Sequence, residues 1–393
     1  MGWRHPCSRD QGFGVFGRMI NFRQGETMLK VDGGYIHPAI EWLPPGRKRE
    51  RMGMFQFLWC IFLLLLTFAM PVEGVAQGSQ KPPRNIILIG WDGAQRNHVK
   101  ECLGRDELPN LKQLSREGTI VAIDILRTTA TKPGWAQILT GYEPEVTGVF
   151  SDRQFGPIPK GYTIFERLKE FFGPRNFAAG AIIAKKRNLG AQPRRFQLLH
   201  EEGKAGKENE PEIEGKIVVK GGRKYFLIPA EPYYYAKNGM DTFLNGLIES
   251  RKVASKACEW LDQYQKRPFF LFVHFSEVDQ KGHQFGENSK EYNDALVSID
   301  AWSGRIIERV KKLGLYDRTL VYVTADHGFD EGLKSHQDAP YVFLATNDRL
   351  VIRRGFRGDI APTILDRFGL DLKKIHPPLS GKPLTKPYQR SLW

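Results

Sequence analysis

Short, uninterrupted runs of apolar residues recur along the chain. They cover residues 85–91, 178–183, 269–275 and 320–323. Runs that are apolar at nearly every position are typical of strands buried on both faces of a parallel sheet. From 292 to 313 the apolar residues instead recur every three or four positions, which predicts a long amphipathic helix. Strands alternating with helices in this way predict an α/β fold around a mostly parallel sheet.

The N-terminal part has the layout of an export signal. A basic cluster at 47–51 precedes an apolar run of 16 residues at 55–70, and small residues follow at 74–76. This layout predicts a signal peptide over 52–76 and therefore a secreted or periplasmic protein. The alternative is an uncleaved membrane anchor. In that case the basic cluster would keep the N-terminal end of the apolar run on the cytoplasmic side. Only in that case do we expect an association with the membrane.

The rest of the chain divides around this signal. Residues 1–51 show no periodicity, and we interpret them as an extension upstream of a true start at Met52 or Met54. Residues 77–84 are rich in Gly, Ser, Lys and Pro and read as a linker. Residues 85–393 remain for one large α/β domain, which is long enough to bury a sizeable core.

Composition adds little to this division. The formal net charge is +14, and a basic surface attracts anions without choosing among them. No motif of a nucleic-acid-binding fold accompanies the charge, so we expect no specific binding to nucleic acid. Of the four cysteines, Cys102 and Cys258 fall in the large domain. They could form one disulfide, but their spacing is not that of a metal site.

Acidic and histidine side chains gather where the predicted strands end. These residues are Asp92 after 85–91, Asp279 and His283 after 269–275, and Asp326, His327 and His336 after 320–323. Open α/β sheets bind their ligands at the carboxyl ends of the strands. Three carboxylates and three imidazoles suit zinc or a similar divalent ion, and six ligands are about right for two ions.

A nucleophile is found in the segment Thr131–Gly141. Pro133 favours the first turn of a helix, which places Thr131 at or just before a helix N-terminus. There the hydroxyl faces free backbone N–H groups and a partial positive charge that favour an oxyanion. A neighbouring metal ion would activate the hydroxyl further.

The order of these motifs resembles the alkaline phosphatase superfamily, particularly its type I phosphodiesterase/nucleotide pyrophosphatase branch. The resemblance runs from about residue 85 to 384 and includes the T-x-P-x(6)-T-G segment at 131–141 and the closing segment that begins at Asp359. It implies a three-layer sandwich with a central, mostly parallel sheet. It also implies a phosphorylated Thr131 intermediate and two divalent ions, which we expect to be zinc. One ion would be held by Asp279, His283 and His336, and the other by Asp92, Asp326, His327 and the Thr131 oxygen.

Several positions depart from the family pattern. Sulfatases of the superfamily carry Cys or Ser at position 131 with Arg four residues on, where this chain has Trp135, so a sulfatase is disfavoured. The phosphodiesterase branch commonly carries Asn at position 134, where this chain has Gly134. Asp152 falls where some threonine phosphatases carry Asn, and there it would repel a phosphate unless it is turned away. His274 alternates within its strand and is interpreted either as packing there or as a support behind the ligands, and not as a ligand itself.

Basic residues near the site are candidate substrate contacts. Threonine-dependent monoesterases resembling this chain carry Lys-x-Arg after the equivalent strand, which here is Lys185 and Arg187. Two cations placed in this way would bind a monoester dianion. The equal alternative is that Lys185 and Arg187 belong to a solvated basic turn. Lys132 and Asp152 complete the set of candidate substrate contacts.

The segment from about 185 to 240 interrupts the alternation of strands and helices. The charged part Glu201–Glu214 is followed by short predicted strands at 216–219 and 225–228. We interpret 185–240 as a small insertion that caps the active site. The tyrosines at 233–235 either pack in the ordinary way, which we favour, or line a pocket.

The first hypothesis is therefore an exported phosphodiesterase that acts on a small phosphate ester. Phosphomonoester hydrolysis is the alternative that Lys185 and Arg187 favour. A lipid-headgroup phosphotransferase remains open if the anchor is uncleaved. A metal-binding protein without turnover also remains open, because of Gly134 and Asp152.

Overall fold

The computed structural model describes residues 83–197, 214–339 and 341–388. The predicted extension and signal peptide, and almost all of the predicted linker, lie outside these residues. Within the described part of the chain, no helix has the length and apolar character needed to cross a membrane.

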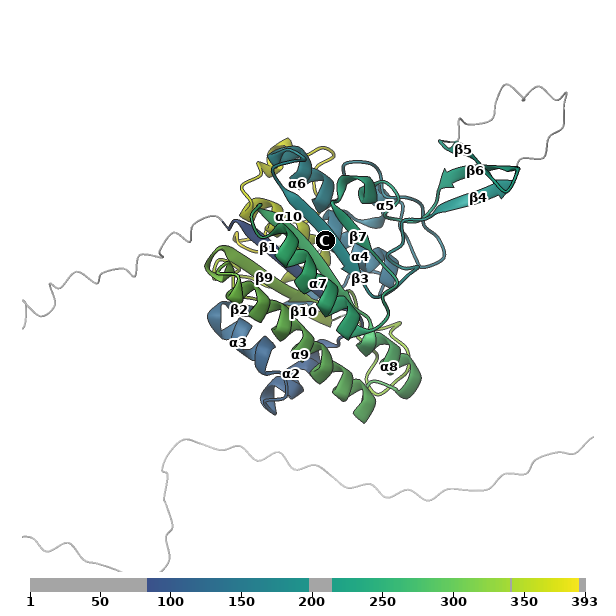
Figure 1. Cartoon of the computed structure of the whole chain (residues 1–393). Helices are drawn as coiled ribbons and strands as arrows, with labels where there is room; N and C mark the ends of the chain where they lie inside the picture. Colours follow the sequence, from purple (N-terminus) through teal and green to yellow (C-terminus); the bar gives the residue numbers. More distant parts are fainter. Residues whose placement is uncertain (1–82, 198–213, 340, 389–393) are drawn as a thin grey trace, which may run out of the picture. The chain divides into compact units, whose positions relative to one another are not determined.

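An eight-stranded sheet forms the centre of the described domain (Figure 1). Seven strands run in one direction, and β10 alone is antiparallel to its neighbours. This confirms the predicted mostly parallel sheet. In spatial order the strands are β11 (Gly355–Phe356), β2 (Thr119–Asp124), β10 (Tyr341–Thr346), β9 (Thr319–Thr324), β1 (Asn85–Trp91), β8 (Phe269–Phe275), β3 (Ala178–Ile183) and β7 (Thr242–Leu244).

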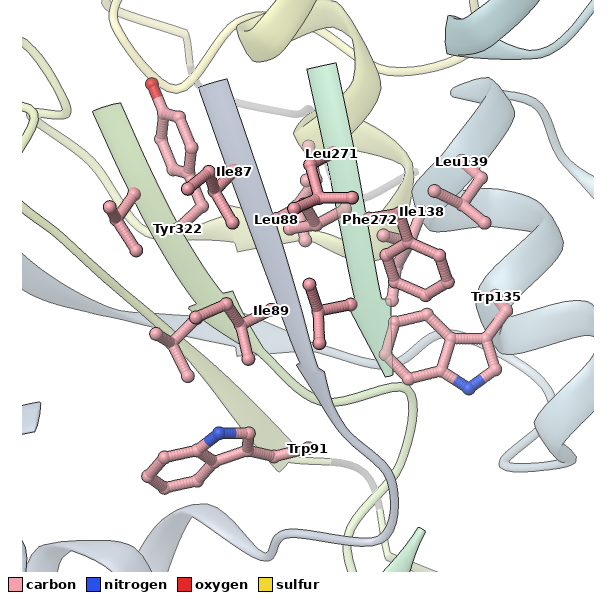
Figure 2. Packing of buried hydrophobic residues seen from close by; sticks show 14 of the residues in the cluster. Ile87, Leu88, Ile89, Trp91, Trp135, Ile138, Leu139, Leu271, Phe272 and Tyr322 are labelled. Carbon is pink, nitrogen blue, oxygen red and sulfur yellow. The ribbon is translucent and has the colours of Figure 1, made fainter. Parts of the chain in front are cut away.

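The four continuous apolar runs of the sequence become the central strands. Every residue of β1, β3, β8 and β9 is buried, as expected of strands covered on both faces (Figure 2). Gly90 in β1 pairs with His274 in β8, and a Cβ at Gly90 would lie 2.3 Å from the Trp135 ring. The absence of a side chain at position 90 therefore lets the indole pack directly on the sheet.

Helices cover the sheet on both faces. They are α2 (Arg96–Gly104), α3 (Pro109–Glu117), α4 (Thr131–Thr140), α5 (Pro144–Thr147), α6 (Ile164–Phe172), α7 (Ser250–Tyr264), α8 (Glu277–Phe285), α9 (Lys290–Lys312) and α10 (Ile360–Arg367). Short 3₁₀ turns lie at Ala236–Gly239, Tyr316–Arg318, Arg357–Asp359 and Leu372–Lys374. Ser289 caps the N-terminus of α9, accepting a hydrogen bond from the backbone N–H of Tyr292 at 3.1 Å.

The alternation of side chains along β8 shows which helices lie on which face. Trp135 of α4 packs on Phe272, with ring centroids 5.3 Å apart. Trp260 of α7 lies against Gly180, which pairs with Leu271, the residue just before Phe272 in β8. Successive strand residues point to opposite faces, so α4 and α7 cover opposite faces of the sheet. The predicted three-layer sandwich is confirmed.

A second, three-stranded antiparallel sheet lies within the predicted insertion. Its order is β4 (Pro193–Gln197), β6 (Arg223–Pro229) and β5 (Lys216–Lys220). Strands β5 and β6 occupy the two runs that the sequence predicted, whereas β4 has no apolar run and was missed. Most of the charged segment Glu201–Glu214 lies outside the described residues. That the insertion caps the active site stays a prediction.

Two further expectations concern individual side chains. Cys102 and Cys258 are both free thiols in the structure, so they do not form the disulfide considered from the sequence. Tyr233 is buried, and its hydroxyl has no hydrogen-bond partner among the described residues. Burial and the nearby Asp326 carboxylate raise the pKa of Tyr233.

Candidate active site

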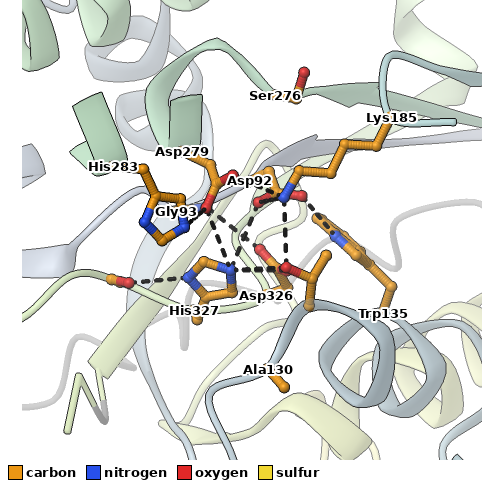
Figure 3. A network of polar contacts seen from close by, with 12 residues as sticks. Asp92, Gly93, Ala130, Trp135, Lys185, Ser276, Asp279, His283, Asp326 and His327 are labelled. Carbon is orange, nitrogen blue, oxygen red and sulfur yellow. Dashed lines mark hydrogen bonds and ion pairs between the residues drawn. The ribbon is translucent and has the colours of Figure 1, made fainter. Parts of the chain in front are cut away.

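The carboxyl edge of the central strands brings the predicted residues together (Figure 3). Asp92 follows β1 directly, and Asp326 and His327 follow β9. Asp279 and His283 lie one turn apart on α8, which begins just after β8. Since β1 lies between β8 and β9 and all three are parallel, these strand ends are neighbours at one edge.

One group that could hold a metal ion consists of Asp279, His283 and His336. Their nearest ligand atoms all lie within 4.8 Å of one another. His283 Nε2 lies 3.4 Å from Asp279 Oδ1, and His283 Nδ1 lies 2.9 Å from the Lys334 carbonyl oxygen. This carbonyl accepts a hydrogen bond from the Nδ1–H, which leaves Nε2 with a free lone pair to bind a metal.

A second group consists of Asp92, Asp279 and His327, again with ligand atoms within 4.8 Å of one another. The resemblance had assigned Asp92, His327, Asp326 and Thr131 to one ion. Asp326 Oδ2 and Thr131 Oγ1 lie 3.4 and 3.2 Å from His327 Nε2, so they adjoin the group as well. The structure differs from this assignment in one respect: Asp279 belongs to both groups, so it could bind both ions.

Two buried carboxylate oxygens without a hydrogen bond indicate that the donor set fits a cation. Asp279 Oδ1 and Asp326 Oδ2 are buried and have no hydrogen-bond partner among the described residues. A buried carboxylate oxygen without a partner is costly unless a cation compensates it. Burial, reinforced by the neighbouring Asp92 carboxylate, raises the pKa of Asp326 well above its usual value. Oxygen and imidazole donors in this arrangement suit a zinc-like ion.

Lys185 places a positive charge inside the same cluster (Figure 3). Its Nζ lies 2.7 Å from Asp92 Oδ1, 2.8 Å from Asp279 Oδ2 and 3.4 Å from Thr131 Oγ1. Burial by itself would lower the pKa of Lys185, but the fields of Asp92 and Asp279 raise it above its usual value. Conversely, burial alone would raise the pKa of Asp92, whereas Lys185 helps to lower it to about 2. The ammonium and both carboxylates are therefore charged.

The geometry of Thr131 agrees with its predicted place at a helix N-terminus. Helix α4 begins at Thr131, and Ala130 is its N-cap residue. The threonine is 3% exposed, and its Oγ1 lies between His327 Nε2 and Lys185 Nζ. Burial and the neighbouring His336 lower the pKa of His327 to about 4, so its imidazole is neutral at pH 7.

His274 orients Asp92 from within the sheet. Its Nε2 lies 2.8 Å from Asp92 Oδ2, and the Trp135 Nε1–H donates to the same oxygen at 3.3 Å. Asp92 Oδ2 is thereby held in place, while Oδ1 faces Lys185. This arrangement agrees with the interpretation of His274 as a supporting residue and not a ligand.

The sequence analysis missed Arg357. Its buried guanidinium donates from Nη1 to the Asp326 carbonyl oxygen at 2.6 Å and from Nη2 to the Thr128 carbonyl oxygen at 2.7 Å. It therefore ties the segment before Thr131 to the end of β9. A Cβ at Gly134 would lie 2.9 Å from Arg357 Nη1 and 2.9 Å from Asp326 Cβ. An Asn at position 134 has no room, which explains this departure from the family pattern.

The other candidate substrate contacts behave differently from Lys185. Asp152 Oδ1 accepts a hydrogen bond from the Lys132 backbone N–H at 2.8 Å, in the first turn of α4. The Lys132 ammonium donates to the Asp152 carbonyl oxygen at 2.8 Å and lies over the Phe155 ring. Arg187 is exposed. Of these four residues, only Lys185 contacts the Asp and Thr side chains of the site, and the substrate roles of all four stay predictions.

Comparisons with known proteins agree with this geometry. Residues 86–368 match the family model described as type I phosphodiesterase / nucleotide pyrophosphatase. The bis(5'-adenosyl)-triphosphatase ENPP4 of Homo sapiens is 23% identical over 272 residues, covering 68% of this chain and 53% of the relative. Ectonucleotide pyrophosphatase/phosphodiesterase family member 1 of Mus musculus is 27% identical over 255 residues, covering 64% and 24%. This chain thus spans about half the length of the first relative and a quarter of the second.

Among solved structures, Ps i-CgsB in complex with k-i-k-neocarrahexaose aligns with a TM-score of 0.50 and 17% identity, covering 77% of this chain and 75% of that chain. At this identity the likeness concerns the fold alone. The family match is broader evidence, because it begins in β1 and ends just after α10, and so contains every strand end that carries a site residue. The chain belongs to the type I phosphodiesterase/nucleotide pyrophosphatase family, in the alkaline phosphatase superfamily that its motifs resemble.

Proposed function

We propose that this protein is an exported, two-metal phosphohydrolase that cleaves phosphodiesters through a covalent intermediate on Thr131. One observation carries the proposal. Thr131 Oγ1 is buried at the N-terminus of α4, 3.2 Å from His327 Nε2 and 3.4 Å from Lys185 Nζ, beside two groups of possible metal ligands. A hydroxyl in this position can be activated as a nucleophile, because the Lys185 ammonium and the N-terminus of α4 place positive charge beside it.

The donor set supports two divalent ions, and zinc is the ion we propose. Asp279, His283 and His336 would hold one ion. Asp92, Asp326, His327 and the Thr131 oxygen would hold the other, with Asp279 within reach of both groups. When bound, such a pair of ions stabilises charge on the attacking and departing oxygens.

The protein's own residues position the reacting groups. The Thr131 Oγ attacks phosphorus as its proton passes to water, and the bond from phosphorus to the first alcohol breaks. That alcohol leaves as its alkoxide, with the bonding electrons, and takes a proton from water. The phosphoryl group, still carrying its second ester, remains on Thr131 until water cleaves the new Oγ–P bond. Lys185 lies close enough to Oγ1 to neutralise charge on the phosphoryl oxygens, and the N-terminus of α4 contributes a partial positive charge.

The names of the relatives support a phosphodiester or phosphoanhydride substrate. Two of them are named as a bis(5'-adenosyl)-triphosphatase and as an ectonucleotide pyrophosphatase/phosphodiesterase. A second candidate function is phosphomonoester hydrolysis. It is favoured by Lys185, because a buried ammonium near the nucleophile would stabilise the additional negative charge of a monoester dianion.

Export is proposed from the sequence alone. The basic cluster at 47–51, the apolar run at 55–70 and the small residues at 74–76 support a cleaved signal. A secreted or periplasmic location follows from it. An N-terminal sequence of the exported protein tests this part directly, because it would begin at residue 77, and retention of 55–70 would contradict cleavage.

One substrate comparison tests the proposed activity. An aryl phosphodiester, an aryl phosphomonoester and an aryl sulfate are offered to the purified protein, with and without added zinc. We expect the diester to be hydrolysed fastest, in a zinc-dependent way, and the sulfate to be untouched. Faster turnover of the monoester would select the second candidate, and no turnover of either phosphate ester with zinc present would contradict both. Thr131→Ala removes the proposed nucleophilic hydroxyl, whereas Thr131→Ser keeps a hydroxyl. Activity that is lost in the first variant and retained in the second separates loss of the nucleophile from a general disturbance of the site.

A further inference from the structure

The strands of the three-stranded sheet in the insertion carry positive charges only. Each of its strands contributes two cations, and none contributes a carboxylate. The cations are Arg194 and Arg195 in β4, Lys216 and Lys220 in β5, and Arg223 and Lys224 in β6. All are exposed, and none forms an ion pair with a carboxylate of the described residues. The sheet is therefore a cationic surface that its own described surroundings do not neutralise.

The pairing of the strands places an apolar strip on one face of this sheet. Phe196 and Ile217 both pair with Phe226, so the three side chains lie in a row across the strands. Val219 lies two residues beyond Ile217 and so points to the same face. Phe196, Ile217 and Val219 are 43%, 61% and 66% exposed. Large apolar side chains at this exposure, grouped in one strip, are typical of a surface that meets a partner.

Cations stand at both ends of the strip. Arg194 lies on the same face at the base of the sheet, two residues before Phe196, and its guanidinium is 5.5 Å from that ring. Lys224 pairs with Val219 at the opposite end. Beyond it, β5 and β6 are joined by Gly221 and Gly222, whose positive φ angles of 60° and 71° form a tight hairpin turn. The tip of the hairpin is thus narrow and flanked by basic residues.

We propose that this sheet docks on an anionic lipid bilayer, with the strip Phe196–Phe226–Ile217–Val219 entering the headgroup region and Arg194 and Lys224, on the same face, meeting lipid phosphates. The other four cations point to the opposite face and add only to the long-range attraction. Apolar side chains flanked by Lys and Arg are the features that interfacial binding requires, because burial and attraction to anionic lipids add to one another. This inference is independent of the reaction at Thr131, and it does not require that residues 55–70 are retained. Figure 1 shows the three strands apart from the eight-stranded sheet, where they can meet a surface.

Two other occupants fit the surface less well. A second copy of the chain would bring two cationic sheets together, and like charges facing each other are repelled. A nucleic acid would satisfy the cations, but Ile217 and Val219 would gain nothing from a phosphate backbone, and binding to bases uses aromatic stacking. A bilayer accommodates the aliphatic and the cationic side chains together.

Hydrogen–deuterium exchange on the full-length protein tests the proposal at the sheet itself. Vesicles of pure phosphatidylcholine are compared with vesicles that also contain phosphatidylglycerol. We expect slower exchange over 216–229 with the anionic vesicles only, and a weaker effect at high salt. Exchange that is unchanged by anionic vesicles, or slowed equally by neutral ones, would overturn the proposal. Because exchange is read within 216–229, attachment through another segment does not mimic the result.

Variants assign the effect to the strip and to the charges. Arg194→Gln and Lys224→Gln should each weaken partition into anionic vesicles about fivefold, and Lys220→Gln, on the opposite face, should weaken it less. Ile217→Ser with Val219→Ser should weaken it about tenfold or more. Ile352→Ser, at a residue 54% exposed outside this sheet, is the matched control and should have no effect. Slower exchange at rising protein concentration without vesicles would instead indicate a second copy, and protection by a DNA oligonucleotide but not by vesicles would indicate nucleic acid.

Discussion

Lys185 Nζ lies 2.7 Å from Asp92 Oδ1, at the edge of the sheet where a metal-binding carboxylate is expected. The same ammonium lies 2.8 Å from Asp279 Oδ2, and its side chain is 15% exposed. The Lys185 ammonium therefore contacts two carboxylates that we also propose as ligands of the metal ions. This relationship gives the site a cation that does not dissociate, next to the residues that we propose bind the metal ions.

The first prediction concerns the loss of this charge. Replacing Lys185 by Met keeps the length of the side chain and removes the ammonium. We expect turnover to fall about 10²-fold, since one charged group near the reacting oxygen is lost. Metal content should not fall, because the variant leaves Asp92 and Asp279 free for metal. Rates on an aryl diester and an aryl monoester, together with metal analysis, check this.

The same variant separates the two candidate functions. A monoester dianion carries more negative charge than a diester, so Lys185→Met should slow monoester hydrolysis more than diester hydrolysis. Lys185→Arg, which keeps the positive charge, is the control. Equal rates for Lys185→Met and the natural protein on both substrates would exclude a role for the ammonium.

The second prediction concerns the shared ligand. Asp279 belongs to both groups of possible ligands, whereas His283 belongs to one. Asp279→Asn should therefore reduce bound zinc at both positions, and His283→Asn should reduce it by about one ion per chain. Equilibrium dialysis with zinc measures both numbers. Identical occupancy in the two variants would show that Asp279 serves a single ion.

The third prediction follows from the close approach of Gly134 and Arg357. Gly134→Ala places a methyl group against Arg357 Nη1 and Asp326 Cβ, and we expect it to destabilise the protein by about 1–3 kcal/mol. Urea unfolding measures this loss. The matched control is Gly156→Ala, because a Cβ at Gly156 meets nothing within 4 Å. If Gly134→Ala were as stable as this control, the contact would be looser than the structure shows.

The fourth prediction is a dependence of stability on pH that arises from His98. Its Nδ1 lies 2.7 Å from Glu287 Oε1, while Glu287 Oε2 accepts a hydrogen bond from the Gly332 backbone N–H at 3.0 Å. Burial by itself would lower the pKa of His98, but its contacts with Cys102 and Glu287 raise it to about 10 from 6.5. The charged pair thereby supports the loop that leads to His336.

A histidine whose pKa is raised on folding contributes stability that is fully present below its unfolded pKa and is lost as pH rises through its folded pKa. The contribution of His98 should therefore be complete below about pH 6.5 and should decline towards pH 10. His98→Gln should cost about 1–3 kcal/mol at pH 6 and less at pH 9. Unfolding free energies at the two pH values measure this, and a cost for His98→Gln that does not change with pH would contradict the charged pair.

The sequence allowed the central sheet and the strand-end ligands to be predicted, because both depend on local patterns. Continuous apolar runs can be buried only between two layers, and Asp92, Asp279 and Asp326 each follow such a run within four residues. Thr131 could be located because Pro133 marks a helix start. Each of these inferences needs only a few consecutive residues.

What was missed depends on contacts between distant segments. Arg357 reaches Thr128 and the end of β9 across 229 and 31 residues, and no local pattern announces such a contact. Strand β4 was missed because its sequence, PRRFQ, is mostly polar and is stabilised by pairing with β6. The contact of Lys185 with two carboxylates also required the fold, although the charge of the Lys185–Arg187 segment drew attention to it.

The central claim is that Thr131 carries the covalent intermediate. The most direct measurement is mass spectrometry of the peptide containing Thr131 after acid quenching of the zinc-loaded protein during turnover of a bis-aryl phosphate. We predict an aryl-phosphoryl group on Thr131 in the natural protein and on serine in Thr131→Ser, with none at this position and no turnover in Thr131→Ala. An unmodified Thr131 during rapid turnover, or full activity of Thr131→Ala, would contradict the account.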